Sequence, residues 1–165
     1  MSSRIARSLT IAAFAATLAA CSSVPLDQSG TGTADGSGST STGQIMDPFN
    51  PQSPLAQQRS VYFDFNSYVV PDQYRSVVEM HSSYLTSNGQ QRIRIEGNAD
   101  ARGGTEYNLA LGQRRSEAVA RMMTLMGVSA GQIEAISFGK ERPKALGNTE
   151  ADFAENRRAD IVYQQ

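Results

Sequence analysis

The sequence predicts a two-layer α/β fold in its last two thirds, with a mixed β-sheet and helices packed on one face. Three observations carry this prediction. Residues 92–96 alternate polar and apolar side chains, as a half-buried strand does. A polar loop at 98–104 then leads into a long helical segment, and a last strand-like segment lies at 159–163. Strand-like and helix-like segments thus alternate in the order βαβαβ(α)β, which is typical of an α/β domain.

The other elements follow from the same kind of pattern. The aromatic and β-branched residues 60–65 predict the first strand, and residues 133–138 predict the third. Asp72 is expected to cap a helix that runs to about Ser87, and residues 150–155 predict a short helix. The apolar face of the helix after Asp72 comprises Tyr74, Val77, Val78, His81, Tyr84 and Leu85. Its position on this face predicts that His81, the chain's one histidine, is a core residue.

The long helix is expected to begin at Thr105, whose hydroxyl can accept a hydrogen bond from an amide of the first turn. Asn108 stands where a capping box would carry Glu or Gln, so that signature is partial. Glu106 suits the positive end of the helix dipole. Gly127 is expected to end the helix.

One arginine of this helix lies where an apolar residue is expected. At 3.6 residues per turn, Arg115 falls inside the apolar stripe. A buried charge without a partner is costly, so Arg115 needs a carboxylate or a polar cleft. Two interpretations stay open: a structural ion pair with Asp100 or another acid, and a ligand site. The stripe itself comprises Leu111, Ala118, Met122, Leu125 and Met126.

The N-terminal residues 1–20 have the plan of an export signal, because two arginines precede an apolar run too short to span a bilayer. The run ends in Leu-Ala-Ala-Cys at 18–21, which resembles the lipobox of bacterial lipoproteins. This resemblance implies that Cys21 becomes the first mature residue and is acylated. Ser22 follows, with no Asp beside the cysteine, which implies sorting to the outer membrane.

Residues 21–58 are predicted to form a flexible tether that follows the lipidated cysteine. Residues 27–44 are almost all Ser, Gly and Thr and have no apolar periodicity. Three prolines are expected to discourage helix and to stiffen the last part: Pro48, Pro51 and Pro54. The folded domain is therefore expected at 59–165, where it can work at a distance from its membrane.

The charge and the cysteine count exclude several classes of function. The net charge is -1, and removal of the signal segment leaves 13 basic and 16 acidic residues, or -3. Nucleic-acid binding needs a concentrated basic face, so it is not expected. With one cysteine, neither an intrachain disulfide nor a Cys-based zinc cluster can form. No metal and no cofactor are predicted.

Several stretches of the chain resemble the OmpA-like peptidoglycan-binding domain family. They are VYFDFNSY (61–68), EGNADARGGTEYNLALGQRRSEAV (96–119), SFGKERP (137–143), LGNTEA (146–151) and NRRADIVY (156–163). The resemblance implies an OmpA-like βαβαβ(α)β two-layer sandwich. With the lipobox and the tether, the whole chain is similar to the lipoproteins of this family. It also implies non-covalent binding of the diaminopimelate in peptidoglycan stem peptides, with no enzymatic activity.

The resemblance assigns roles to individual residues. Asp100 is expected to accept hydrogen bonds from the ligand ammonium, and Arg115 to grip a carboxylate with its forked guanidinium. The other ligand-binding positions are Phe65, Asn66, Arg102 and Leu111. Many members of the family carry Asp where this chain has Asn66, which removes one negative charge from the ammonium pocket. Many carry His where this chain has Asn98, and Asn still donates a hydrogen bond.

The resemblance also implies partners and a location. The chain is expected to be anchored in the outer membrane with its domain facing the periplasm, linking that membrane to peptidoglycan within the Tol-Pal system. That system serves envelope integrity and constriction of the outer membrane in cell division. An alternative is that the same cleft chiefly docks the protein TolB. A third hypothesis, a wall hydrolase using Asp100 and Glu106 as a carboxylate pair, is weak, because an arginine in the cleft holds Asp100 ionised. For Arg158, a structural ion pair or a solvated position is favoured over a site role.

Overall fold

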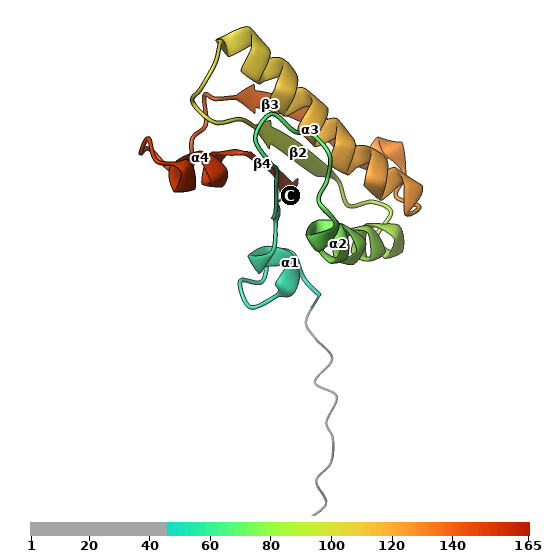
Figure 1. Cartoon of the computed structure of the whole chain (residues 1–165). Helices are drawn as coiled ribbons and strands as arrows, with labels where there is room; N and C mark the ends of the chain where they lie inside the picture. The colour runs from blue at the N-terminus through green and yellow to red at the C-terminus, as the bar shows by residue number, and fades with distance from the viewer. Residues whose placement is uncertain (1–45) are drawn as a thin grey trace, which may run out of the picture. The chain divides into compact units, whose positions relative to one another are not determined.

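The computed structural model describes residues 46–165, so the expected signal segment, Cys21 and the predicted tether up to residue 45 lie outside the described residues. The described residues form four strands and four α-helices; α1 lies before the first predicted strand, and the other elements follow the predicted order (Figure 1). The strands are β1 (Ser60–Tyr62), β2 (Ile93–Asn98), β3 (Ile133–Gly139) and β4 (Arg158–Tyr163). The helices are α1 (Pro54–Gln57), α2 (Arg75–Ser87), α3 (Thr105–Leu125) and α4 (Glu150–Asn156).

The sheet is mixed, as predicted, with the strand order β1-β4-β2-β3. Strands β2 and β3 are parallel, because helix α3 crosses over between them, whereas β4 runs antiparallel to both β1 and β2. In this register Ile95 of β2 lies opposite Ala135 on one side and Ile161 on the other. The loop 99–104, which joins β2 to α3, is thereby placed at one end of the sheet.

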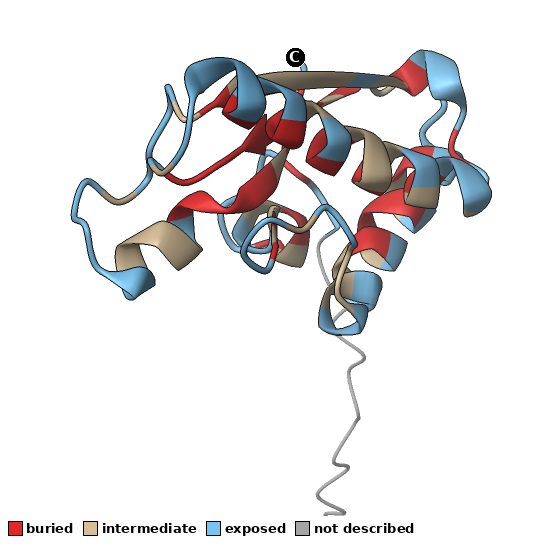
Figure 2. Cartoon of the chain, turned by 45° about the horizontal axis from the view of Figure 1, so that its top comes forward, coloured by how far each residue is buried: buried red, intermediate tan, exposed pale blue. Residues whose placement is uncertain are grey.

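The hydrophobic core joins α2 and α3 to one face of the sheet. Ile93 and Ile95 are fully buried there, and they alternate with Arg94 and Glu96 on the other face. Along α3, buried positions recur every three to four residues, so they lie on one side of the helix (Figure 2). The core comprises Val61, Phe63, Val78, Leu85, Ile93, Ile95, Val119, Met123, Val128, Ala159, Ile161 and Tyr163.

The buried face of α3 differs from the predicted stripe. Leu111 and Arg115 are buried as expected, but Leu125 is 89% exposed, and Val119 and Met123 take the core positions. The reason is a close backbone approach between α3 and β2. A Cβ added at Gly97 would lie 1.8 Å from the carbonyl oxygen of Gly112. The helix therefore turns its small residues to the sheet, and the predicted stripe of Leu111, Ala118, Met122, Leu125 and Met126 is wrong at Ala118 and Leu125.

The beginnings of two helices also differ from the prediction. Thr105 is the first helical residue rather than the cap, and Gly104 precedes it without a side-chain hydrogen bond. Asn108 instead ties the preceding loop to the helix through its side chain. Asp72 opens a one-turn 3₁₀ helix (Asp72–Tyr74), and α2 starts after it at Arg75. Glu106 lies in the first turn of α3, as expected.

The chain packs against the domain before the predicted boundary at Arg59. Helix α1 forms although prolines were expected to discourage it, because a proline suits the first turn of a helix. The Ser53 hydroxyl accepts a hydrogen bond from the Leu55 amide at 3.2 Å, and Leu55 is fully buried. The first strand ends at Tyr62, three residues earlier than predicted, because a turn follows that joins the Ser67 amide to the Asp64 carbonyl.

The histidine is a core residue, as predicted. His81 is fully buried on α2, with Nδ1 2.8 Å from the Tyr163 hydroxyl and Nε2 2.7 Å from the Gln58 carbonyl. A carbonyl can only accept, so Nε2 carries the proton and Nδ1 accepts from Tyr163. Burial lowers the pKa of His81. Among residues 46–165, no helix combines the length and the apolar composition needed to cross a membrane.

Candidate functional site

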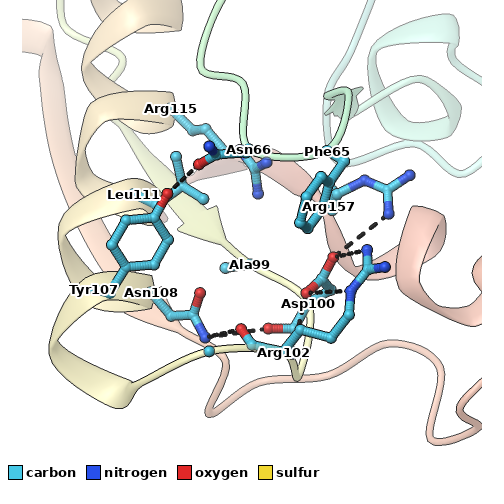
Figure 3. A pocket seen from close by; sticks show the side chains of 11 residues that line it. Phe65, Asn66, Ala99, Asp100, Arg102, Tyr107, Asn108, Leu111, Arg115 and Arg157 are labelled. Carbon is cyan, nitrogen blue, oxygen red and sulfur yellow. Dashed lines mark hydrogen bonds and ion pairs between the residues drawn. The ribbon is translucent and has the colours of Figure 1, made fainter.

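A cavity of about 170 Å³ opens where β2, the loop 99–104, the first turns of α3 and the loop after β1 meet. It contains all six residues predicted to bind ligand: Phe65, Asn66, Asp100, Arg102, Leu111 and Arg115. Figure 3 shows Asp100 on one side of this cavity and Arg115 on the other. Five further residues line it: Ala99, Gly103, Tyr107, Asn108 and Arg157. The fold therefore brings together the two charges singled out in the sequence.

Asp100 is 5% exposed and is surrounded by donors. Its Oδ2 lies 2.6 Å from Arg102 Nη2 and 3.4 Å from Arg157 Nη1, and its Oδ1 accepts from the Arg102 amide at 3.1 Å. Asn108 Nδ2 donates to the main-chain carbonyls of Asp100 and Arg102, at 3.3 and 2.8 Å, which fixes this loop on α3. Burial alone would raise the pKa of Asp100, but the hydrogen bonds and charge of Arg102, with help from Arg157, hold it below its usual range.

Arg115 is fully buried, and its hydrogen-bond partners are main-chain carbonyls rather than a carboxylate. Its Nε donates to the Ser67 carbonyl at 2.8 Å, its Nη1 to the Asn98 carbonyl at 2.8 Å and its Nη2 to the Asp64 carbonyl at 3.2 Å. Of the two interpretations of Arg115, the structural ion pair with Asp100 or another acid does not hold: among the described residues Arg115 forms no salt bridge, because main-chain oxygens take its hydrogen bonds.

The charge of Arg115 is therefore left without a direct counter-ion beside the cavity. Burial, then the nearby charge of Arg157, lower the pKa of Arg115 to about 10, so it stays protonated at neutral pH. A guanidinium has five N–H groups, and three of them are used here. One N–H on each terminal nitrogen has no partner among the described residues, and Arg115 is one of the residues that line the cavity.

Arg102 is held by both stacking and ion pairs. Its guanidinium carbon lies 4.4 Å from the Phe65 ring centroid and 4.3 Å from the Phe153 ring centroid. It pairs with Asp100 on one side and with Glu150 Oε2 at 3.2 Å on the other. Phe65 is 62% exposed, so this stack lies at the mouth of the cavity.

A second contact joins the loop after β1 to α3. Asn66 has a φ of 54°, in the left-handed region that Asn tolerates better than most residues. Its Oδ1 accepts a hydrogen bond from the Tyr107 hydroxyl, and Figure 3 shows this bond beside Leu111. Asn66 therefore shapes the rim of the cavity through Tyr107.

Arg157 is a lining residue that the sequence interpretation missed. It is 8% exposed and pairs through Nη1 with Glu150 Oε1 at 2.8 Å as well as with Asp100. The sequence interpretation weighed its neighbour Arg158, which forms a structural pair with Asp160 at 2.8 Å. Arg157 caps the C-terminal end of α4 and Arg158 begins β4, and only Arg157 lines the cavity. The doubled arginine was the available signal, but it does not say which of the two points inward.

The arrangement can bind a small molecule with both signs of charge. Arg115 places a positive charge on one side of the cavity, and Asp100, whose oxygens pair with Arg102 and Arg157, places a negative charge on the other. Within the described residues, no group of three or more His, Cys, Asp or Glu side chains is placed to hold a metal ion. Tyr107 and Leu111 add an apolar wall for a ligand's carbon chain.

Comparisons with known proteins identify the family. The sequence profile of the OmpA family matches residues 62–157. The peptidoglycan-associated lipoprotein of Haemophilus influenzae is 38% identical over 160 residues, which cover 97% of this chain and 99% of that protein. The protein of the same name from Pseudomonas putida is 38% identical over 144 residues, with 86% of both chains covered.

Solved structures agree with the sequence relatives. The crystal structure of the peptidoglycan-associated lipoprotein from Burkholderia pseudomallei is 58% identical, with a TM-score of 0.69, and covers 71% of this chain and 98% of that one. The periplasmic domain of Helicobacter pylori MotB shares the fold, with a TM-score of 0.55 at 17% identity, over 64% of this chain and 70% of that one. The match to the family profile and the relatives that span nearly the whole sequence place this chain in the OmpA family.

Proposed function

We propose that this chain is an outer-membrane lipoprotein that binds peptidoglycan without covalent chemistry, through the diaminopimelate of the stem peptide. It would link the outer membrane to the cell wall as part of the Tol-Pal system. One observation carries this proposal: Asp100 and Arg115 line the same cavity, from opposite sides (Figure 3). The names of the Haemophilus and Burkholderia relatives, which are called peptidoglycan-associated lipoproteins, support it.

The geometry suits one end of diaminopimelate, which carries an ammonium and a carboxylate on a single carbon. The carboxylate takes the two unused N–H groups of Arg115, a cation that lacks a direct counter-ion. The ammonium is directed to Asp100, and the hydrocarbon chain passes between Leu111 and the ring of Phe65. Asn66 and Arg102 border the same space. Because Arg115 is otherwise uncompensated, the carboxylate contributes most of the electrostatic attraction.

The N-terminal features complete the proposal. Cleavage of residues 1–20 and acylation of Cys21 would fix the chain in the outer membrane, with the domain in the periplasm. The segment between Cys21 and α1 would then let the domain reach peptidoglycan. In this location the protein would serve envelope integrity and the constriction of the outer membrane during cell division.

A hydrolase is not supported by the same residues. A glycosidase needs one carboxyl whose pKa is raised so that it can donate a proton. The second carboxyl of the hypothesised pair, Glu106, does not line the cavity. The pKa of Asp100 is lowered, because the hydrogen bonds from Arg102 and Arg157 outweigh its burial, so Asp100 cannot be the proton donor either. We therefore propose a binding protein rather than an enzyme.

A second candidate function is docking of the protein TolB on this cleft. The observation in its favour is the aromatic rim of the cavity, where Phe65 is 62% exposed and Tyr107 53%. Exposed aromatic side chains beside a pocket are typical of protein interfaces. Peptidoglycan and TolB would then alternate at one site, and excess diaminopimelate peptide would displace TolB from the chain.

Sedimentation with purified peptidoglycan tests the proposed function. The full chain is expected to sediment with peptidoglycan, and Asp100→Asn, which keeps the shape of the side chain, is expected to remain in solution. Asp72→Asn is the matched control, because it makes the same change at an exposed aspartate that does not line the cavity. Circular dichroism checks that each variant is folded. If Asp100→Asn sedimented with peptidoglycan as well as wild type does, this cavity would not be the peptidoglycan-binding site.

A further inference from the structure

Asp100, the carboxylate proposed to receive a ligand ammonium, already has a cation in place. Arg102 donates to both of its oxygens, from Nε to Oδ1 at 3.3 Å and from Nη2 to Oδ2 at 2.6 Å. The main-chain amide of Arg102 adds a third hydrogen bond to Oδ1. Arg157 takes a further position at 3.4 Å. A ligand ammonium must compete with Arg102 for this carboxylate, because both groups are cations that would donate hydrogen bonds to the same two oxygens.

Arg102 lies near the surface and has other contacts that could hold its guanidinium if a ligand displaced it from Asp100. Its side chain is 37% exposed, whereas that of Arg157 is 9% exposed, so Arg102 is the outer of the two cations on Asp100. The rings of Phe65 and Phe153 hold its guanidinium, and Glu150 accepts from its other terminal nitrogen. Glu150 and the two rings can keep the guanidinium nearby after it leaves Asp100.

The charges that line the cavity decide which ligands can displace Arg102 from Asp100. Three guanidinium groups line it, from Arg102, Arg115 and Arg157, against the single carboxylate of Asp100. A ligand that brings only an ammonium meets net positive charge and must also displace Arg102. A ligand that brings a carboxylate with its ammonium gains the contact with Arg115, which offsets that cost.

We infer that Arg102 is the specificity-determining residue of this cavity, an internal cation that excludes ligands carrying an ammonium without a neighbouring carboxylate. This inference rests on the proposed peptidoglycan-binding function. It explains how the site would separate stem peptides with diaminopimelate from those with lysine at the third position. The two side chains share the ammonium and differ by the carboxylate beside it. Discrimination would come from a group that repels the wrong ligand as well as from contacts to the right one.

Calorimetric titration of the full chain with two synthetic tripeptides tests the inference. The probes are L-Ala-γ-D-Glu-meso-diaminopimelate and the same tripeptide with L-lysine in third place. Wild type is expected to prefer the first by about tenfold or more. Arg102→Met, which keeps an apolar side chain between Phe65 and Phe153, is expected to gain about tenfold in affinity for the lysine tripeptide and to lose the preference. Arg102→Lys retains the charge and is expected to retain the preference.

Arg142→Met is the matched control. Arg142 also stacks on a phenylalanine, 3.5 Å from the Phe138 ring centroid, and pairs with a carboxylate, Glu96 at 3.5 Å, but it does not line the cavity. Its replacement is expected to leave both affinities unchanged. An unchanged preference in Arg102→Met, or equal weakening of both tripeptides, would overturn the inference while wild-type binding upholds the proposed function. Failure of wild type to bind either tripeptide would overturn both.

Discussion

The guanidinium of Arg115 donates a hydrogen bond to the main-chain carbonyl of Asn98, with 2.8 Å between Nη1 and the oxygen. This bond joins the buried centre of α3 to the end of β2, two residues before Asp100. The other nitrogens of Arg115 hold the carbonyls of Asp64 and Ser67. One side chain therefore fixes both segments that border the cavity, so Arg115 is structural as well as a proposed ligand contact.

Replacement of Arg115 by Lys is expected to lower the free energy of unfolding by about 2–4 kcal/mol, because each buried carbonyl left without a donor costs roughly 1–3 kcal/mol. The single nitrogen of Lys cannot serve three carbonyls placed around a planar guanidinium. Urea denaturation measures the change. Arg114→Lys, one residue away and exposed, should stay within about 0.5 kcal/mol of wild type. Equal stability of the two variants would show that the three main-chain hydrogen bonds contribute little.

Gly97→Ala is expected to destabilise the domain by about 3 kcal/mol, because overpacking at a close contact forces the backbone to move. The added Cβ would lie 1.8 Å from the carbonyl oxygen of Gly112. Gly89→Ala is the control, since a Cβ at Gly89 has no neighbour within 4 Å. Thermal unfolding of the two variants separates the effects. A melting temperature for Gly97→Ala equal to that of Gly89→Ala would contradict the close approach of α3 and β2.

Leu55→Ala is expected to lower the free energy of unfolding by about 2–4 kcal/mol, the usual cost of removing a buried leucine side chain. The matched substitution Leu125→Ala removes the same atoms from a position that is 89% exposed and should cost about 0.5 kcal/mol or less. Urea denaturation of the full chain measures both. If Leu55→Ala were as mild as Leu125→Ala, α1 would not be part of the cooperative domain.

Stability is expected to fall as the pH drops below about 6.5, the ordinary pKa of histidine. Burial lowers the pKa of His81 in the folded state, so the unfolded chain binds the proton first. The contribution of His81 to the free energy of unfolding is therefore complete above the pKa of histidine in the unfolded chain. It declines below that pKa, by at most about 1.4 kcal/mol per pH unit.

Asp100 makes stability depend on pH in a second, lower range. Its pKa in the folded protein is below the ordinary value, so its contribution to the free energy of unfolding is lost as the carboxyl becomes protonated.

Urea denaturation at pH 7.5 and pH 5.5 checks the histidine window. The difference in unfolding free energy between the two pH values is expected to shrink in His81→Gln, which does not titrate. The same difference in wild type and His81→Gln would assign the pH dependence to other groups.

Local pattern predicted the order of the elements and the mixed sheet, because alternation in 92–96 and the helical period after residue 105 are read directly from side chains. It failed where tertiary packing decides. The sequence does not reveal that Gly97 and Gly112 meet, and that contact turns α3 so that Val119 rather than Ala118 enters the core.

For the candidate site, the sequence indicated the two charged residues but not the hydrogen-bond partners of Arg115. Asp100 and Arg115 were found from a polar loop and a charge in an apolar stripe, but the partners of Arg115 are main-chain carbonyls, which leave no mark in a sequence. The sequence motif contained Arg157, but the choice between it and Arg158 depends on where β4 begins.

The most direct test of the account is a titration of the ¹⁵N-labelled chain with L-Ala-γ-D-Glu-meso-diaminopimelate, followed through its amide resonances. If the cavity binds this peptide, saturable shifts are expected in the loops that contain Asn66 and Asp100 and in the first two turns of α3, and they are expected to be lost in Asp100→Asn. No saturable shifts, or shifts confined to residues far from the cavity such as Asn88 and Gln91, would contradict the claim that this cavity binds peptidoglycan.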